Sequence, residues 1–97
     1  MRESVIEKYL DDEVRKAGGV TRKFLGRMNN PDRIVIWPAQ AGKYFSAYVH
    51  FVELKKPGKK PRAGQARELR RLQDMGCVAV YLDTKPLVDQ YVKGWRK

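Results

Sequence analysis

Cysteine and histidine are almost absent from this 97-residue sequence, which contains one of each. A single cysteine excludes an intramolecular disulfide, and one cysteine with one histidine excludes a Cys/His zinc site within one chain. Long apolar stretches are also missing: the longest run covers only residues 77–82, whereas a membrane helix needs about twenty residues. Five acidic residues before position 14 are untypical of a signal peptide. We therefore expect a cytoplasmic protein that does not bind membranes.

Acidic residues are in the minority. Eleven Asp and Glu stand against 21 Lys and Arg, which gives a formal net charge of +10. Because 42% of the residues are hydrophobic, the chain is too apolar for a disordered basic tail. Its length fits a single domain over residues 1–97. A charge excess of this size indicates a polyanionic partner, and nucleic acid is the default candidate.

The positive charge is concentrated in one part of the chain. Residues 54–72 hold eight bases and one acid, a net charge of +7, whereas residues 1–16 have a net charge of −1. A second, weaker cluster consists of Arg22, Lys23, Arg27 and Arg33. Such concentration is expected of a surface that follows a phosphate backbone. The alternative is a solvated basic face without a partner. The candidate phosphate contacts are Lys23, Lys56, Lys59, Lys60, Arg62, Arg67, Arg70 and Arg71.

Hydrophobic patterning and turn signals predict seven elements in the order α-β-β-β-α-β-α. The expected helices cover residues 2–17, 62–75 and 85–95, and the expected strands cover residues 20–25, 33–37, 44–55 and 77–82. Ala66, Leu69 and Leu72 form the apolar seam of the second helix. The last strand is wholly apolar, which predicts that both of its faces are covered. The pattern predicts an α/β fold with a mixed central sheet flanked by helices.

The third predicted strand ends on an acid and a base that share a face. Side chains alternate along a strand, so Glu53 and Lys55 point one way and Leu54 the other. Pro31 restricts the loop before the second strand and helps to fix Asp32 at the sheet edge. Asp32 and Glu53 are a hairpin's length apart, so their carboxylates can converge and form part of an Mg²⁺ shell. The alternative is an ordinary surface pair of Glu53 and Lys55.

Two predicted helices carry polar side chains on their inward faces. At 100° per residue, Glu3 lies about 20° from Leu10, inside the apolar arc of the first helix. Gln65 lies about 40° from Leu69 in the second helix. An inward Glu3 can pair with a metal-bound water or with Lys55, and an inward Gln65 can orient a ligand or a water. The alternatives are a first-turn acid favoured by the helix dipole and a satisfied core amide.

These residues carry a family resemblance. Pro31-Asp32 followed by Glu53-Leu54-Lys55, with a glutamate in an N-terminal helix, resembles the PD-(D/E)xK nuclease superfamily. The longer string FVELKKPGKKP at residues 51–61 resembles the virus-type replication-repair nuclease (VRR-NUC) domain, over nearly the whole chain. The further positions that match are Gly18-Gly19, Lys23-Phe24, Gln65, Leu69, Leu72 and Gly76. One departure is Asn29-Asn30, where the family tends to have Gly and an aliphatic residue.

The resemblance implies a restriction-endonuclease-like core and phosphodiester hydrolysis with Mg²⁺ or Mn²⁺, without a small-molecule cofactor. It implies metal ligation by Asp32, Glu53 and the Leu54 main-chain carbonyl, with Glu3 in the outer coordination shell. Lys55 corresponds to the catalytic lysine, and Gln65 and Lys23 correspond to supporting site residues. The implied catalytic set is therefore Glu3, Asp32, Glu53, Lys55 and Gln65.

The resemblance also suggests a substrate. Free-standing phage or bacterial members resemble Holliday-junction resolvases, DNA-repair endonucleases that cut two opposed strands of a four-way junction. Cutting both strands requires a homodimer with its sites related by a two-fold axis, in the host cytoplasm if the protein is phage-encoded. The last helix and the aromatic residues of the third strand offer either a dimer surface or core packing. Those aromatic residues are Tyr44, Phe45, Tyr48 and Phe51.

Two other functions remain open at this point. A non-catalytic, basic nucleic-acid-binding protein explains the charge but leaves Glu3, Asp32 and Glu53 without a role. A nuclease for flaps, nicks or a restriction-type target has the same site chemistry as a junction resolvase. Loss of cleavage in an alanine variant at Asp32 or Glu53 distinguishes a nuclease from a DNA-binding protein.

Overall fold

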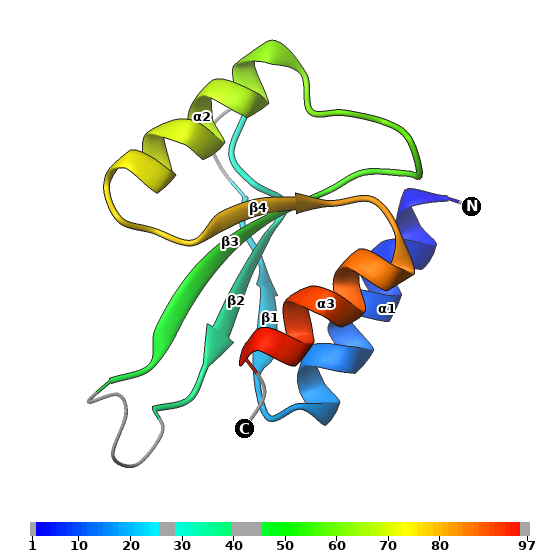
Figure 1. Ribbon diagram of the computed structural model, residues 1–97, viewed down its shortest axis with the longest axis vertical. Coiled ribbons are helices and arrows are strands. Elements are labelled where there is room, and N and C mark those ends of the chain that lie inside the picture. The colour runs from blue at the N-terminus through cyan, green and yellow to red at the C-terminus, as the bar shows by residue number, and fades with distance from the viewer. Residues whose placement is uncertain (1, 26–28, 40–45, 96–97) are drawn as a thin grey trace.

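The computed structural model describes residues 2–25, 29–39 and 46–95. Its elements follow the predicted order α-β-β-β-α-β-α (Figure 1). They are α1 (Glu3–Lys16), β1 (Val20–Lys23), β2 (Arg33–Trp37), β3 (Tyr48–Leu54), α2 (Ala63–Asp74), β4 (Ala79–Leu82) and α3 (Lys85–Trp95). The strands β1 and β4 are two residues shorter than predicted, and the predicted start of β3 at residues 44 and 45 lies outside the described residues.

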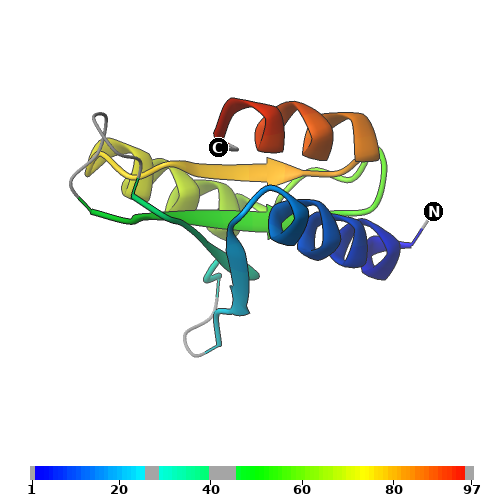
Figure 2. The same ribbon diagram turned by 90° about the horizontal axis from the view of Figure 1, so that it is seen from below.

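The four strands form one mixed sheet in the order β1-β2-β3-β4. The pairs β1–β2 and β2–β3 are antiparallel, and β3–β4 is parallel. The helices α1 and α3 cover one face and α2 covers the other (Figure 1). Seen from below, α1 and α3 lie in front of the sheet and α2 lies behind it (Figure 2). The predicted α/β class and the mixed sheet with flanking helices are confirmed.

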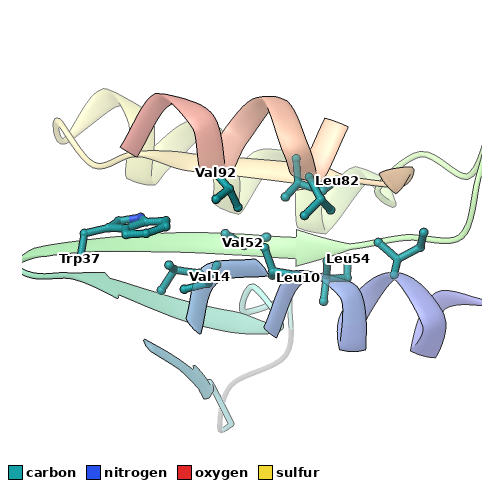
Figure 3. Packing of buried hydrophobic residues seen from close by; sticks show 10 residues of the cluster. Leu10, Val14, Trp37, Val52, Leu54, Leu82 and Val92 are labelled. Atoms are coloured by element: carbon teal, nitrogen blue, oxygen red, sulfur yellow. The ribbon is translucent and has the colours of Figure 1, made fainter. Parts of the chain in front are cut away.

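The main core lies between the sheet and the pair α1 and α3 (Figure 3). Ile6, Leu10 and Val14 are fully buried because their spacing of four residues keeps them on one helix face. Alternation along β3 likewise sends Val52 and Leu54 to this face. The other buried residues of the cluster are Val35, Trp37, Leu82, Val88 and Val92. Burial of these side chains fixes the register of the strands, because a slip by one residue reverses every face.

The layer under α2 is thinner. This helix buries Gln65 and Leu69, whereas Ala66 is exposed and Leu72 is half-buried, so the predicted seam is only partly correct. The prediction that the last strand is covered on both faces is wrong, because Tyr81 is 39% exposed. The physical reason is that β4 is an edge strand with α2 as its cover on that face, and α2 leaves part of it open.

Most of the aromatic residues offered as a dimer surface pack inside the molecule. Tyr91 and Trp95 of α3 pack against the core, and the Tyr48 ring lies 5.6 Å from the Trp95 ring. Phe51 packs against Phe24, with ring centroids 5.8 Å apart. Core packing is therefore the better interpretation of these residues, while Tyr44 and Phe45 lie outside the described residues.

His50 is buried within this aromatic cluster. Its ring lies 4.3 Å from the Trp95 ring in an edge-on arrangement, and its Nδ1 lies 2.6 Å from the Tyr91 hydroxyl. The indole N–H of Trp37 donates to the same hydroxyl at 3.1 Å, so the Tyr91 O–H is left to donate to His50. Burial lowers the pKa of His50 to about 4, so the imidazole is neutral at physiological pH.

Arg33 is buried between β2 and α1 and has a structural role. It belongs to the second basic cluster in sequence, yet only 6% of it is exposed, and its guanidinium pairs with Glu7 and Asp11 of α1. The Thr21 hydroxyl donates to the same Asp11 carboxylate at 2.8 Å. Arg33 therefore anchors α1 to β2 through these ion pairs. Arg27 lies outside the described residues.

Candidate active site

Asp32 and Glu53 lie at the same end of two paired strands. The antiparallel register pairs Arg33 with Val52, so one further step places Asp32 opposite Glu53. The Leu54 N–H donates to Asp32 Oδ2 at 2.9 Å, which holds the Asp32 side chain against the end of β3. The Asp32 carbonyl also accepts a hydrogen bond from the Phe24 N–H at 3.1 Å. The convergence of the two carboxylates that hairpin spacing predicted is present in the structure.

The Glu53 carboxylate is buried without hydrogen bonds. Only 1% of the residue is exposed, and neither Oε1 nor Oε2 has a hydrogen-bond partner among the described residues. The Lys55 ammonium lies 3.3 Å from Glu53 Oε2, which is an ion pair without hydrogen-bond geometry. The two side chains share a face as predicted, and the low exposure of the pair makes an ordinary surface ion pair a poor description.

Burial, and to a lesser extent the nearby Asp32 charge, raise the pKa of Glu53 to about 7, while Lys55 partly opposes both effects. Two carboxylates in one place are costly unless a cation or a proton compensates them, and the Glu53 oxygens find no hydrogen-bond donor among the described residues. A hard divalent cation prefers such oxygen ligands. The residues present therefore fit a divalent cation held between Asp32 and Glu53.

Main-chain contacts with β4 fix the position of Lys55. Its N–H donates to the Leu82 carbonyl at 3.0 Å, directly after the parallel pairing of Leu54 with Leu82. The Gly58 N–H then donates to Asp83 Oδ2 at 3.1 Å. This bond ties the basic connector, residues 55–62 between β3 and α2, to the residue that follows β4. Sequence reasoning missed Asp83, because no local signal links residues that are 25 positions apart.

Gln65 points inward as predicted and is buried. Its side-chain oxygen accepts the Arg62 N–H at 2.9 Å and so caps the start of α2. Nearby, Gly64 lies against the loop that carries Asp32, since a Cβ at this position would be 2.6 Å from the Asn29 amide nitrogen. The absence of a side chain at Gly64 lets this loop lie close to α2, a contact that sequence reasoning also missed.

The inward position predicted for Glu3 is wrong, because this residue is exposed. Glu3 is the first residue of α1, and burial on the inward face of this helix begins only at Ile6. Within residues 2–25, 29–39 and 46–95, no group of three or more acidic, histidine or cysteine side chains is placed to hold a metal ion. The site therefore consists of two carboxylates, and the structure does not bring Glu3 into it as a third.

The predicted DNA-contacting residues lie on the segment between β3 and α2, on α2 and on β1. Those of the connector and of α2 are exposed, and Lys23 is exposed on β1. The set comprises Lys23, Lys56, Lys59, Lys60, Arg62, Arg67, Arg70 and Arg71. Arg71 pairs with Glu68 at 3.6 Å, and both lie within α2. The Arg71 side chain is 62% exposed, whereas the Glu68 side chain is 15% exposed.

A sequence relative and a solved structure are similar to this chain. The relative is a protein of Acyrthosiphon pisum secondary endosymbiont phage 1 described as "Putative nuclease p44", which is 43% identical over 89 residues, covering 90% of this chain and 88% of that protein. The solved structure is described as "VRR_NUC domain" and superposes with a TM-score of 0.77 at 26% identity over 96% of both chains. No established family profile matches the sequence. Within the described residues, no helix is long and apolar enough to cross a membrane.

Proposed function

Because the chain belongs to the VRR-NUC family of nucleases, we propose that it is a single-domain enzyme that hydrolyses DNA phosphodiester bonds with Mg²⁺ or Mn²⁺. The observation that carries the proposal is the buried Glu53 carboxylate, which lies beside Asp32. Its two oxygens have no hydrogen-bond partner among the described residues. A binding protein without catalytic chemistry gains nothing from such a costly arrangement. The non-catalytic alternative is therefore the weaker one.

Each proposed site residue has a specific task. Asp32, Glu53 and the Leu54 carbonyl hold the cation, and the Leu54 N–H keeps the Asp32 carboxylate in place. When bound, the cation lowers the pKa of a water molecule and stabilises charge on the scissile phosphate. The Lys55 ammonium, held 3.3 Å from Glu53, orients the attacking water and stabilises the negative charge that develops on phosphorus oxygens. Gln65 keeps the start of α2 in position beside the site.

DNA binding is proposed to rest on the exposed lysine and arginine side chains of the connector and of α2. Contacts to phosphate position a duplex without reading its sequence, and the order of elements contains no module that reads base edges. Recognition is therefore proposed to depend on DNA shape. If about five phosphates are neutralised, log affinity should fall with log salt at a slope near −4 to −5.

The preferred substrate is proposed to be branched DNA, with the four-way junction as the first candidate. One active site cuts one strand, so symmetric cutting of a junction requires two chains related by a two-fold axis. We place this activity in the cytoplasm, where the DNA substrate is available. Flaps and nicks are the alternative substrates, since the same chemistry serves them.

The decisive experiment is cleavage of a labelled four-way junction, a linear duplex and a flap with Mg²⁺ or Mn²⁺ and with EDTA. The variants are Glu53→Gln and a matched control, Glu13→Gln, which changes a half-buried glutamate in α1 that pairs with the exposed Lys16. We expect metal-dependent cutting by the wild type and by Glu13→Gln, with loss of cutting in Glu53→Gln. Binding without cutting of any substrate by the wild type would contradict the nuclease proposal.

The proposed homodimer is tested separately by light scattering at micromolar concentration. A dimer mass together with paired cuts on opposed strands supports it. A monomer mass with symmetric junction cutting contradicts it.

A further inference from the structure

Tyr81 is exposed next to the candidate active site. The parallel register pairs Tyr81 with Glu53 and Leu82 with Leu54. Since Leu54 and Leu82 both belong to the core, alternation places Tyr81 and Glu53 together on the opposite face, towards α2. Paired strands are about 4.8 Å apart, so the Tyr81 side chain begins one strand away from the proposed metal ligand. The residue is 39% exposed, which leaves part of it available for contact.

A pocket of about 290 Å³ lies between β4, α2 and the connector, and Tyr81 forms part of its wall. Pro61, Ala66 and Leu69 add apolar surface, while Lys60 and Arg70 add positive charge. Neither Lys60 nor Arg70 has an acidic partner among the described residues, since Glu68 of the same helix pairs with Arg71. The pocket therefore combines an aromatic ring, an apolar surface and two cations that are free to bind an anion.

A nucleotide matches this combination. Its base has a flat face that stacks on aromatic side chains, and its phosphate is an anion that lysine and arginine bind. A base inside a duplex is already stacked on both sides and cannot reach such a ring. We propose that the Tyr81 pocket binds an unpaired nucleotide adjacent to the scissile phosphate. The position of that phosphate rests on the proposed function at Asp32 and Glu53.

Binding in this pocket gives the nuclease a preference for DNA with an unpaired nucleotide over continuous duplex DNA. On continuous duplex DNA the exposed lysine and arginine side chains contact phosphates only, and the pocket stays empty. On a gap, a flap or the crossover of a junction, an unpaired nucleotide adds a stacking contact on Tyr81. Selection of branched or interrupted DNA then follows from one side chain together with the charges of Lys60 and Arg70.

The test compares DNA affinity by fluorescence anisotropy in EDTA, where no cleavage takes place. One probe is a continuous duplex, and the other is the same duplex with a short single-stranded gap that contains 2-aminopurine. The variants are Tyr81→Ala, Tyr81→Leu and Tyr81→Phe, with Met75→Ala as the control because Met75 is exposed after the end of α2. The Leu variant keeps apolar volume on β4, so it preserves the test if the Ala variant folds poorly.

The wild type should prefer the gapped probe, and Tyr81→Ala or Tyr81→Leu should reduce this preference about tenfold. Tyr81→Phe and Met75→Ala should retain it, and the 2-aminopurine fluorescence should change only with proteins that keep the ring. Equal weakening of both probes by Tyr81→Ala, or an unchanged preference, would overturn the proposal. Failure of the wild type to cut DNA with metal rejects the nuclease function instead, because the stacking test is carried out without metal.

Discussion

Replacing Glu53 by glutamine should stabilise the metal-free protein above pH 7 while abolishing its cleavage of DNA. The Glu53 carboxylate is buried beside Asp32, and its pKa is raised from 4.5 to about 7. A carboxyl group with a raised pKa keeps its proton to a higher pH in the folded state than in the unfolded state. Its contribution to stability is therefore complete below pH 4.5 and is lost as the pH rises through about 7. Glutamine removes this loss because it does not ionise.

The size of the effect follows from the two pKa values. The interval between 4.5 and about 7 corresponds to about 3 kcal/mol at roughly 1.4 kcal/mol per pH unit. Part of this gain is offset, because the glutamine variant loses the ion pair with Lys55. We expect Glu53→Gln to raise the free energy of unfolding by about 1–2 kcal/mol at pH 8 and by much less at pH 5.

Urea unfolding followed by circular dichroism in EDTA measures these free energies at the two pH values, with Glu13→Gln as the matched control. Addition of Mn²⁺ at 100 times its Kd should then stabilise the wild type by about 2.7 kcal/mol and leave Glu53→Gln nearly unchanged. Destabilisation of metal-free Glu53→Gln at pH 8 would refute the reasoning. It would mean that Glu53 and Lys55 form a structural ion pair that needs no cation.

Three further predictions concern stability and the DNA surface. Burial lowers the pKa of His50 from 6.5 to about 4, so this group contributes up to about 3 kcal/mol of stability above pH 6.5, and the contribution is lost as the pH falls to about 4. In urea unfolding, the free energy of unfolding of His50→Gln should therefore decrease less between pH 6.5 and pH 4 than that of the wild type. Gly19→Ala should cost about 1–3 kcal/mol, because its Cβ would lie 2.8 Å from Trp37; an unchanged melting temperature would contradict this. Arg33→Met should destabilise the fold by about 1–3 kcal/mol and leave the salt dependence of DNA affinity unchanged. A smaller slope of log affinity against log salt in this variant would show instead that Arg33 contacts DNA.

The order of elements was predictable because it depends on local patterns. Helical spacing of Ile6, Leu10 and Val14 appears directly in the sequence and brings these residues into the core. Burial alternates along β2, as the period of a strand requires. The shared face of Glu53 and Lys55 follows from the same alternation. These predictions succeed because the period of a helix or strand decides which side chains are buried together.

The errors arise where the answer depends on position in the assembled sheet. A helical wheel gives the direction of Glu3 around the axis of α1, but it does not tell whether other elements cover the helix at its first residue. The exposure of Tyr81 depends on β4 being an edge strand, which the apolar sequence of residues 77–82 does not encode. The burial of Arg33 depends on acids of α1 that are 22 and 26 positions away.

The register of the sheet links the core to the proposed chemistry. Val52 and Leu54 must face α1 and α3 for the core to close, and this requirement forces Glu53 between them to the other face. The same register places Asp32 opposite Glu53 on one side and Tyr81 beside it on the other. A slip of β3 by one residue would bury a carboxylate in the main core, at a cost that the small domain cannot sustain. Hydrophobic packing on one face therefore positions the proposed metal ligands and the proposed nucleotide pocket on the other.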